Sequence, residues 1–206
     1  MRLFRRSLAE HMAEGFAPGH LDSEIVALGN PGDPITAAQF TGEDAPPSDT
    51  ADLAVDAIID WWRLSQPNYP QATRLMIEAD GGGSNAARSR RYKKWLQEFA
   101  DASGLEITVC HYPPGTSKWN PIEHRLFSQI TATWAGYVLS TLMVLLGWIR
   151  RTTTRTGLKV TAAHFDKHYE TGLKVTKAEF QAIQITRNTV CPQWNYTIRP
   201  QLKNTE

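Results

Sequence analysis

RLMIEADGGGSN at residues 74–85 and LEITVCHY at residues 105–112 indicate the topology of this chain. The first begins with a short apolar run that ends at an aspartate and three glycines, and apolar residues alternate in the second. Both patterns predict strands. Residues 86–102 predict a helix between them. Strand, helix and strand with short connections are typical of a parallel βαβ unit, so we expect an α/β fold.

More helices are expected on both sides of this unit. Apolar residues recur at helical spacing from 53 to about 64, and Ser48 or Asp49 can cap that helix. Two further helices are predicted at about 121–134 and 139–152. The unit is thus expected to lie among helices.

A six-residue repeat follows, because TGLKVT occurs at 156–161 and again at 171–176. We interpret the two copies as similar glycine turns, each with a final threonine placed to cap a helix. Thr176 with Glu179 fits a capping box. Two copies are too few for a solenoid.

The composition is that of a globular protein: 206 residues, 41% hydrophobic and 21% charged. The longest mostly apolar run, 137–149, is 13 residues, whereas a bilayer span needs roughly 20, so it predicts a buried helix. The N-terminus has no apolar core of a signal peptide, which favours a cytoplasmic protein. The two cysteines are far apart, which does not favour a disulfide scaffold or a structural zinc site.

Charge is distributed unevenly along the chain. Residues 1–70 carry 4 Lys/Arg and 11 Asp/Glu, a net −7, whereas residues 71–206 carry 18 and 10, a net +8. A basic segment of this length suits a phosphate-rich partner such as DNA.

Asp80 is the first candidate for chemistry. It follows a predicted strand and precedes three glycines, and ligands of α/β sheets gather at the carboxyl ends of strands. The glycines allow a phosphate to approach the backbone closely. The spacing fits neither a dinucleotide fingerprint nor a P-loop. A simple turn aspartate is the alternative.

Glu123 is the second candidate. With Asn120 as N-cap and Pro121 after it, Glu123 is the third helical residue, where it can either complete a capping box or face Asp80. Two carboxylates in a basic chain suit Mg²⁺ and phosphodiester chemistry. Glu78, on the same strand face as Asp80, could add a ligand, although a buried and partnered glutamate is more typical.

Basic and aromatic residues lie near both candidates. They could hold a DNA backbone without reading its sequence, or simply form a solvated helix face. His124, beside Glu123, could contact a phosphate, and Trp119 could stack a base. Cys110 and His111 do not favour zinc, because adjacent strand residues point to opposite faces. The candidate DNA-binding residues are Arg88, Arg90, Arg91, Lys93, Lys94, Lys118, Trp119 and His124.

Four segments carry a specific resemblance: ADGGGSN (79–85), CHYPPGTSKWNPIEHRLFS (110–128), TTTRTGLKV (152–160) and WNYTI (194–198). Together they resemble the Rhodopirellula-type DDE transposases of bacterial insertion sequences. The resemblance runs from about residue 49 to the C-terminus, roughly three-quarters of the chain.

The resemblance implies a catalytic domain with an RNase H-like mixed sheet and flanking helices. Such a domain cuts and joins DNA strands with two Mg²⁺ (or Mn²⁺) ions. Asp80 then corresponds to the second acid of the triad and Glu123 to the third, and both hold metal. The implied partners are transposon-end and target DNA and further copies of the chain, at the bacterial nucleoid in the cytoplasm and not at a membrane.

The resemblance also implies a division of the chain. Residues 49–155 correspond to a partial catalytic core, 156–206 to a helical C-terminal extension with the repeat, and 1–48 to an unmatched, partly irregular segment with one short strand expected at 25–28. No first acid is identifiable, and some N-terminal strands are expected to be missing. We therefore expect a truncated transposase with weak or no activity.

Two alternatives stay open. One is a non-catalytic DNA-binding or regulatory fragment that keeps the basic face. The other is an RNase H-like nuclease whose first carboxylate comes from residues 1–48, where Asp22 and Asp33 are candidates.

Overall fold

The computed structural model describes residues 2–7, 24–29, 37–40, 50–79, 85–113, 116, 119, 123–164, 167, 169–170 and 172–201. Contacts within the chain divide it into two compact units. Unit 1 comprises Asp49–Pro114 and Tyr169–Glu206, and unit 2 comprises Arg2–Ser48 and Gly115–His168. Unit 1 is therefore interrupted in sequence by part of unit 2.

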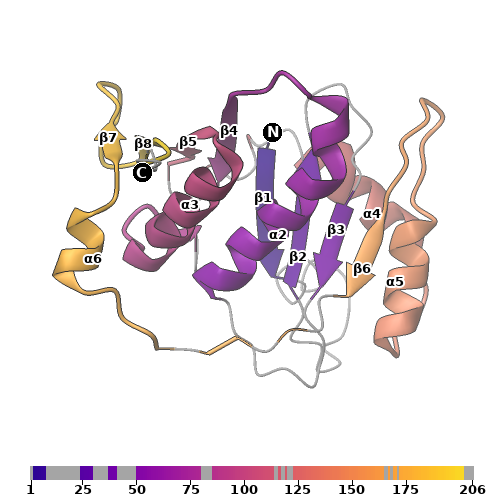
Figure 1. The fold of residues 1–206 in the computed structure, drawn as a ribbon. Helices are drawn as coiled ribbons and strands as arrows, with labels where there is room; N and C mark the ends of the chain where they lie inside the picture. The colour runs from indigo at the N-terminus through magenta and orange to yellow at the C-terminus, as the bar shows by residue number, and fades with distance from the viewer. Residues whose placement is uncertain are drawn as a thin grey trace. The chain divides into compact units, whose positions relative to one another are not determined.

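Unit 1 contains a mixed four-stranded sheet with the order β4-β5-β8-β7 (Figure 1). Strands β4 (Arg74–Ala79) and β5 (Glu106–His111) pair in parallel, in register from Arg74 opposite Glu106 to Ala79 opposite His111. The predicted parallel βαβ unit is confirmed. On its other edge β5 pairs antiparallel with β8 (Asn195–Ile198), which in turn pairs antiparallel with β7 (Ile185–Arg187).

Helix α3 (Arg90–Ser103) connects the two parallel strands. It begins four residues later than predicted because Ser89 is its N-cap, accepting a hydrogen bond from the backbone N–H of Tyr92 at 3.2 Å. It ends at Gly104, whose φ of +74° is a left-handed conformation that glycine adopts without strain. Its buried face includes Tyr92, Leu96 and Phe99.

Helix α2 (Ala51–Ser65) precedes the sheet, close to the predicted position. Its N-cap is Thr50 and not Ser48 or Asp49: the Thr50 hydroxyl accepts a hydrogen bond from the backbone N–H of Leu53 at 3.2 Å. Apolar side chains at helical spacing bury one face. They include Ala54, Ala57, Ile58 and Trp61.

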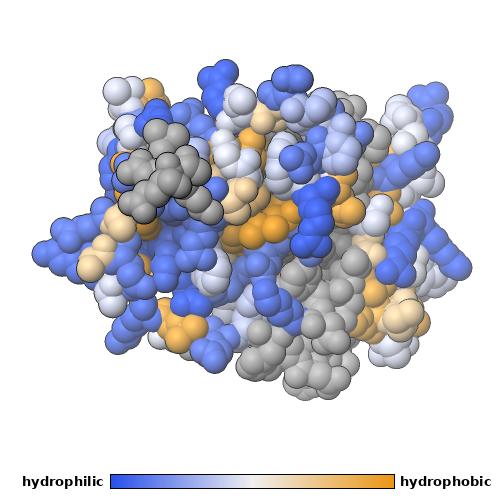
Figure 2. All heavy atoms as spheres, in the orientation of Figure 1, coloured by the Kyte–Doolittle hydropathy of each residue, from blue (hydrophilic) through white to orange (hydrophobic). Residues whose placement is uncertain are grey.

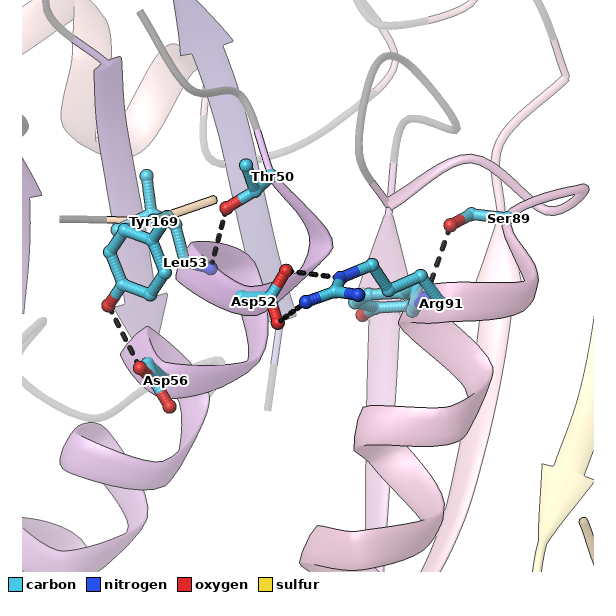
Figure 3. A network of polar contacts seen from close by, with 8 residues as sticks. Thr50, Asp52, Leu53, Asp56, Ser89, Arg91 and Tyr169 are labelled. Carbon is cyan, nitrogen blue, oxygen red and sulfur yellow. Dashed lines mark hydrogen bonds and ion pairs between the residues drawn. The ribbon is translucent and has the colours of Figure 1, made fainter. Parts of the chain in front are cut away.

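An ion pair joins α2 to α3 (Figure 3). Arg91 binds Asp52 through two hydrogen bonds, Nε to Oδ2 at 2.5 Å and Nη2 to Oδ1 at 2.7 Å. The Asp52 side chain is only 9% exposed and that of Arg91 24%. On the same helix Asp56 accepts a hydrogen bond from the hydroxyl of Tyr169 at 2.9 Å, and burial followed by that bond raises the pKa of Tyr169. The first turns of α2 are thus fixed from two directions.

Unit 2 contains a second four-stranded sheet with the order β1-β2-β3-β6. Strands β1 (Arg2–Ser7), β2 (Glu24–Gly29) and β3 (Ala37–Phe40) pair antiparallel in succession, and β3 pairs in parallel with β6 (Ala162–His164). The predicted strand at 25–28 is confirmed as β2. Two further strands lie in the same N-terminal segment.

The helices of unit 2 begin with a π-helical turn, η4 (Glu123–Phe127), which leads directly into α4 (Ser128–Trp134). This confirms the predicted helix over 123–134, while 121 and 122 lie outside the described residues. The buried side chains of this helix are Leu126, Phe127, Ile130 and Trp134.

Only residues 142–149 of the apolar run lie in α5 (Leu142–Arg150), because Thr141 is the N-cap, so the helix begins three residues later than predicted. The helix buries Leu145, Leu146 and Ile149, whereas Met143 is 70% exposed, so the prediction of a buried helix holds for one face only. In the described part of the chain, every helix is too short or too polar to cross a membrane.

The two copies of TGLKVT adopt different structures. Gly157 and Gly172 both have a left-handed φ, as expected for turns. Thr176 then caps α6 (Lys177–Gln181) in a complete capping box with Glu179, which confirms that prediction. Thr161, by contrast, leads into β6, so the predicted helix cap is wrong there. The residue three positions after it is His164 and not a glutamate.

We expect Asp52→Ala to lower the free energy of unfolding by about 2 kcal/mol, because a half-buried guanidinium loses its carboxylate. Urea denaturation followed by tryptophan fluorescence measures the change. Asp60→Ala is the matched control, since Asp60 pairs with the exposed Arg63 at 3.5 Å and should lose at most about 0.5 kcal/mol. Equal losses in the two variants would contradict a special role for the Asp52–Arg91 pair.

Candidate functional site

The carboxyl ends of β4 and β5 lie side by side in unit 1. Ala79 is fully buried opposite His111, and its carbonyl accepts a hydrogen bond from the backbone N–H of Tyr112 at 2.7 Å. The next residue, Asp80, and the four after it lie outside the described residues. The structure therefore places Ala79, the residue immediately before Asp80, whereas the position of the Asp80 carboxylate stays a prediction.

Glu78 lies near the end of β4 and is half-buried. Its Oε2 accepts a hydrogen bond from the hydroxyl of Tyr112 at 3.0 Å. Burial, and then the nearby charge of Glu78, raises the pKa of the Cys110 thiol. Glu78 is thus the partnered glutamate that the sequence favoured over a metal ligand.

His111 ends β5 and is buried. Its Nδ1 lies 2.7 Å from the carbonyl oxygen of Trp194, and its Nε2 lies 2.8 Å from that of Asn85. The ring also stacks at a tilt on Tyr196, with centroids 5.8 Å apart. Sequence reasoning treated His111 only as a poor zinc ligand and missed these contacts, whose acceptors are distant in sequence.

Glu123 is the first residue of η4, in the part of the sequence assigned to unit 2. The side chains of Glu123 and His124 are outside what the structure describes, as is the whole of Lys118. Among the described residues, no three metal-ligating side chains form a group. The pairing of Asp80 with Glu123 therefore stays a prediction.

The predicted DNA-binding cations around the start of α3 have three different environments. Arg88 and Arg90 are exposed, and the Arg90 guanidinium lies 5.2 Å from the centre of the Phe180 ring. Arg91 is half-buried and paired with Asp52. Lys94 is paired with Glu179, Nζ to Oε1 at 2.8 Å, a bond that raises the pKa of Lys94. Arg88 and Arg90 are thus the most accessible of the four.

Lys93 differs from the other four cations, because its side chain is almost entirely buried. Its ammonium donates a hydrogen bond to the carbonyl of Ala87 and lies 5.0 Å from the centre of the Tyr196 ring. Burial, and then the positive charges of Arg187 and Arg90, lower the pKa of Lys93 to about 8. In this structure Lys93 supports the start of α3 from inside.

Trp119 lies in unit 2 and is 66% exposed. Its backbone N–H donates to the carbonyl of Thr116 at 2.9 Å. A large exposed aromatic ring is available for stacking. This position agrees with the base-stacking hypothesis without testing it.

A groove that sequence reasoning did not predict lies between α2 and α3. It has a volume of about 370 Å³, and Figure 2 shows apolar surface over these two helices. Its aromatic lining comes from Trp62, Trp95 and Phe99, and Arg63 and Glu98 add opposite charges. Helical periodicity identified the buried face of α2 but could not show that its edge stays open.

The family model for the Rhodopirellula transposase DDE domain matches residues 45–200. The chain belongs to this family. No curated protein and no solved structure matches it. The DDE transposase domain therefore includes both parallel strands of unit 1, the positions of Asp80 and Glu123, and strands β7 and β8, while β1, β2 and β3 precede it. The expected start at about residue 49 agrees with this match.

The low pKa of Lys93 predicts a pH-dependent stability. In the unfolded chain Lys93 holds its proton up to about pH 10.5 and in the folded domain only to about 8, so the unfolded state binds more protons between these values. The free energy of unfolding should therefore rise with pH in this window.

Between pH 8 and pH 10, we expect the free energy of unfolding of the wild type to rise by on the order of 1–2 kcal/mol more than that of Lys93→Met. Urea denaturation at a series of pH values measures it. The tyrosines titrate in both proteins, so the difference isolates Lys93. Parallel pH profiles would contradict the burial of its ammonium.

Proposed function

We propose that this DDE transposase domain cleaves and joins DNA strands with divalent metal ions bound by Asp80 and Glu123. The observation that carries the proposal is the parallel pairing of β4 with β5, which ends at Ala79 immediately before Asp80. The carboxyl end of a parallel pair is the edge at which α/β proteins bind ligands. The family match adds that transposases of this kind act on DNA.

Carboxylate oxygens are the ligands that Mg²⁺ prefers, so the proposed donor set fits Mg²⁺ or Mn²⁺. DDE transposase domains generally use divalent metals, which supply an activated nucleophile and stabilise the leaving oxygen. The acids of this chain would hold the ions, and the glycines after Asp80 would leave room for the DNA backbone. We further propose that the mixed sheet of unit 1 corresponds to an RNase H-like sheet.

The DNA-binding face is proposed to include Arg88 and Arg90 at the start of α3. Both guanidiniums are exposed, follow the glycine loop in sequence and can contact phosphates. Trp119 supplies a stacking surface on the other unit. Lys118 and His124 stay candidates by sequence. Arg91 and Lys94 would reach DNA only by leaving their carboxylate partners.

A non-catalytic DNA-binding or regulatory role is the second candidate. It is favoured by the exposure of Arg88, Arg90 and Trp119, because these side chains can bind DNA without any metal. The first acid of the triad is also unassigned, and Asp22 or Asp33 is the proposed source if the chain is a nuclease. Self-association and a nucleoid location are proposed for the transposase by family resemblance.

A thermal melt with Mg²⁺ or Mn²⁺ tests the metal site. We expect the metal to stabilise the wild type by about 2.7 kcal/mol at concentrations 100-fold above Kd. Asp80→Asn should lose most of this gain because one carboxylate ligand is removed. Asp60→Asn is the matched control, since Asp60 lies on α2 and pairs with Arg63.

A wild type whose melting temperature does not respond to either metal would contradict the catalytic proposal. With metal bound, cleavage of transposon-end DNA is the next assay. Little strand transfer is expected, because no first acid of the triad is identifiable in the sequence. If cleavage is observed, its loss in Asp22→Asn or Asp33→Asn would identify the missing carboxylate.

DNA binding measured as a function of salt tests the basic face. The double variant Arg88→Ala/Arg90→Ala should make the negative slope of log K against log salt shallower by about 2, because two phosphates are no longer neutralised by arginine. Arg63→Ala is the control, because its side chain is 76% exposed but lies on α2.

An unchanged slope in the double variant would contradict the assignment of these arginines. Salt-dependent binding that survives Asp80→Asn, in a chain that no metal stabilises, would favour the regulatory role.

A further inference from the structure

The connection between α5 and β6 carries cations that lie outside the proposed DNA-binding face. It contains TTTRTGLKV (152–160), one of the four segments on which the family resemblance rests. Between Glu123 and Asp166 the sequence has five Lys/Arg residues and neither Asp nor Glu, a formal charge of +5 with the histidines neutral. Such a stretch favours a polyanionic partner. Four of the five cations lie at the end of α5 or in the connection: Arg150, Arg151, Arg155 and Lys159.

The connection is closed at its base. Arg150, the last residue of α5, donates from Nε to the carbonyl oxygen of Ala162, the first residue of β6, at 2.7 Å. The backbone N–H of Thr152 donates to the carbonyl of Ile149 at 3.0 Å. Figure 1 shows the result as a narrow loop between α5 and β6. Residues 151–161 therefore form a loop whose two ends are held together.

The tip of this loop is a hydrogen-bonded turn. The backbone N–H of Gly157 donates to the carbonyl of Thr154 at 2.9 Å, and that of Leu158 donates to Thr154 Oγ1 at 3.2 Å. Gly157 has a φ of +92°, a left-handed conformation that glycine adopts without strain. The hydroxyls of Thr154 and Thr156 lie 3.0 Å apart, which adds a further bond. Arg155 follows Thr154 in the turn, and its side chain is exposed.

Apolar residues fix the loop on both sides of this turn. After it, Val160 is 8% exposed and Ala162 2%, whereas Lys159 is exposed. Before it, the guanidinium of Arg151 lies 5.3 Å from the centre of the Trp148 ring, a cation–π contact that orients it. The loop is thus held by apolar burial while its cations stay in solvent.

Three of these cations remain available to a partner. Arg151, Arg155 and Lys159 are exposed, and within the part of the chain that the structure describes none of them forms an ion pair with Asp or Glu. Arg91 and Lys94 at the start of α3, by contrast, are paired. A guanidinium matches a phosphate with two parallel hydrogen bonds, and an ammonium adds a point charge. This chemistry suits a phosphodiester backbone.

We propose that the loop at 151–161 is a second DNA-binding site, which holds the phosphate backbone of duplex DNA through Arg151, Arg155 and Lys159. The choice of DNA among polyanions rests on the proposed function. The loop belongs to unit 2, whereas Arg88 and Arg90 belong to unit 1. Phosphate contacts carry no sequence information, so the site binds any duplex and needs no metal. Its closed base and fixed turn lower the ordering cost of binding.

Two triple variants of the full chain test the site. The loop variant is Arg151→Gln/Arg155→Gln/Lys159→Gln. The control variant is Arg63→Gln/Lys174→Gln/Lys177→Gln, which removes the same charge from exposed positions of unit 1. Lys174 also lies in the second TGLKVT copy, so the control matches the local sequence of Lys159. Both variants should melt close to the wild type, because substitutions of exposed side chains change stability little.

Fluorescence anisotropy with a labelled duplex of arbitrary sequence, in EDTA, gives the first measurement. Each phosphate contact contributes about 0.9 to the slope of log K against log salt, so the loop variant should make the negative slope shallower by about 2.7. The control should keep the slope of the wild type. An unchanged slope in the loop variant, an equal change in both variants, or a wild type that binds no duplex would overturn the proposal.

Two further measurements locate the contact and its partner. In hydrogen exchange with and without DNA, peptides covering 151–161 should exchange more slowly with DNA bound, whereas peptides covering 172–177 should not change. Absence of protection at 151–161 would overturn the proposal. So would a loop variant that loses binding to vesicles of phosphatidylcholine and phosphatidylserine but keeps its DNA binding, because the loop would then serve a membrane surface.

The metal-dependent melts of the wild type and Asp80→Asn separate this proposal from the proposed function. If metal stabilises the wild type but the loop variant keeps the wild-type slope, the loop site is wrong and the metal site stands. If no metal stabilises the wild type but the loop variant has the shallower slope, the catalytic proposal fails and the loop site stands.

Discussion

The structure of unit 1 depends on the need of β5 for hydrogen-bond partners on both of its edges. Ile107 and Val109 of this strand are fully buried, so an unpaired edge would leave main-chain groups without water or a partner. Parallel pairing with β4 satisfies one edge and antiparallel pairing with β8 the other. The end of the candidate metal loop, the His111 contacts and the packing of α3 all follow from this arrangement.

Much of this core was predictable because it is encoded locally. The strands and helix of the βαβ unit lie within 40 residues of one another, and their apolar spacing indicates both type and order. Helix ends were less predictable: Thr50 and Ser89 compete with other good capping residues nearby. The repeat illustrates the same limit, since Glu179 provides a capping partner in one copy and His164 does not in the other.

The environment of the candidate site depends on residues that are distant in sequence. Five cations within seven positions indicated one basic face, but Arg91 pairs with a carboxylate 39 residues away and Lys94 with one 85 residues away. Lys93 is buried by the fold. The pairing of β5 with β8 brings together positions 89 residues apart, as Thr108 and Thr197 show. Local patterns contain no information about such partners, whereas the family resemblance singled out WNYTI, which includes β8, and predicts Asp80 and Glu123 as acids.

The interruption of unit 1 by residues 115–168 has a consequence for synthesis. A ribosome completes β4, α3 and β5 long before β8 exists, and at roughly 5–20 residues per second the wait is several seconds. During that time one edge of β5 stays open, which is the kind of edge through which nascent chains associate. The domain therefore depends on β8, or on a chaperone until β8 has been synthesised, to cover the open edge of β5.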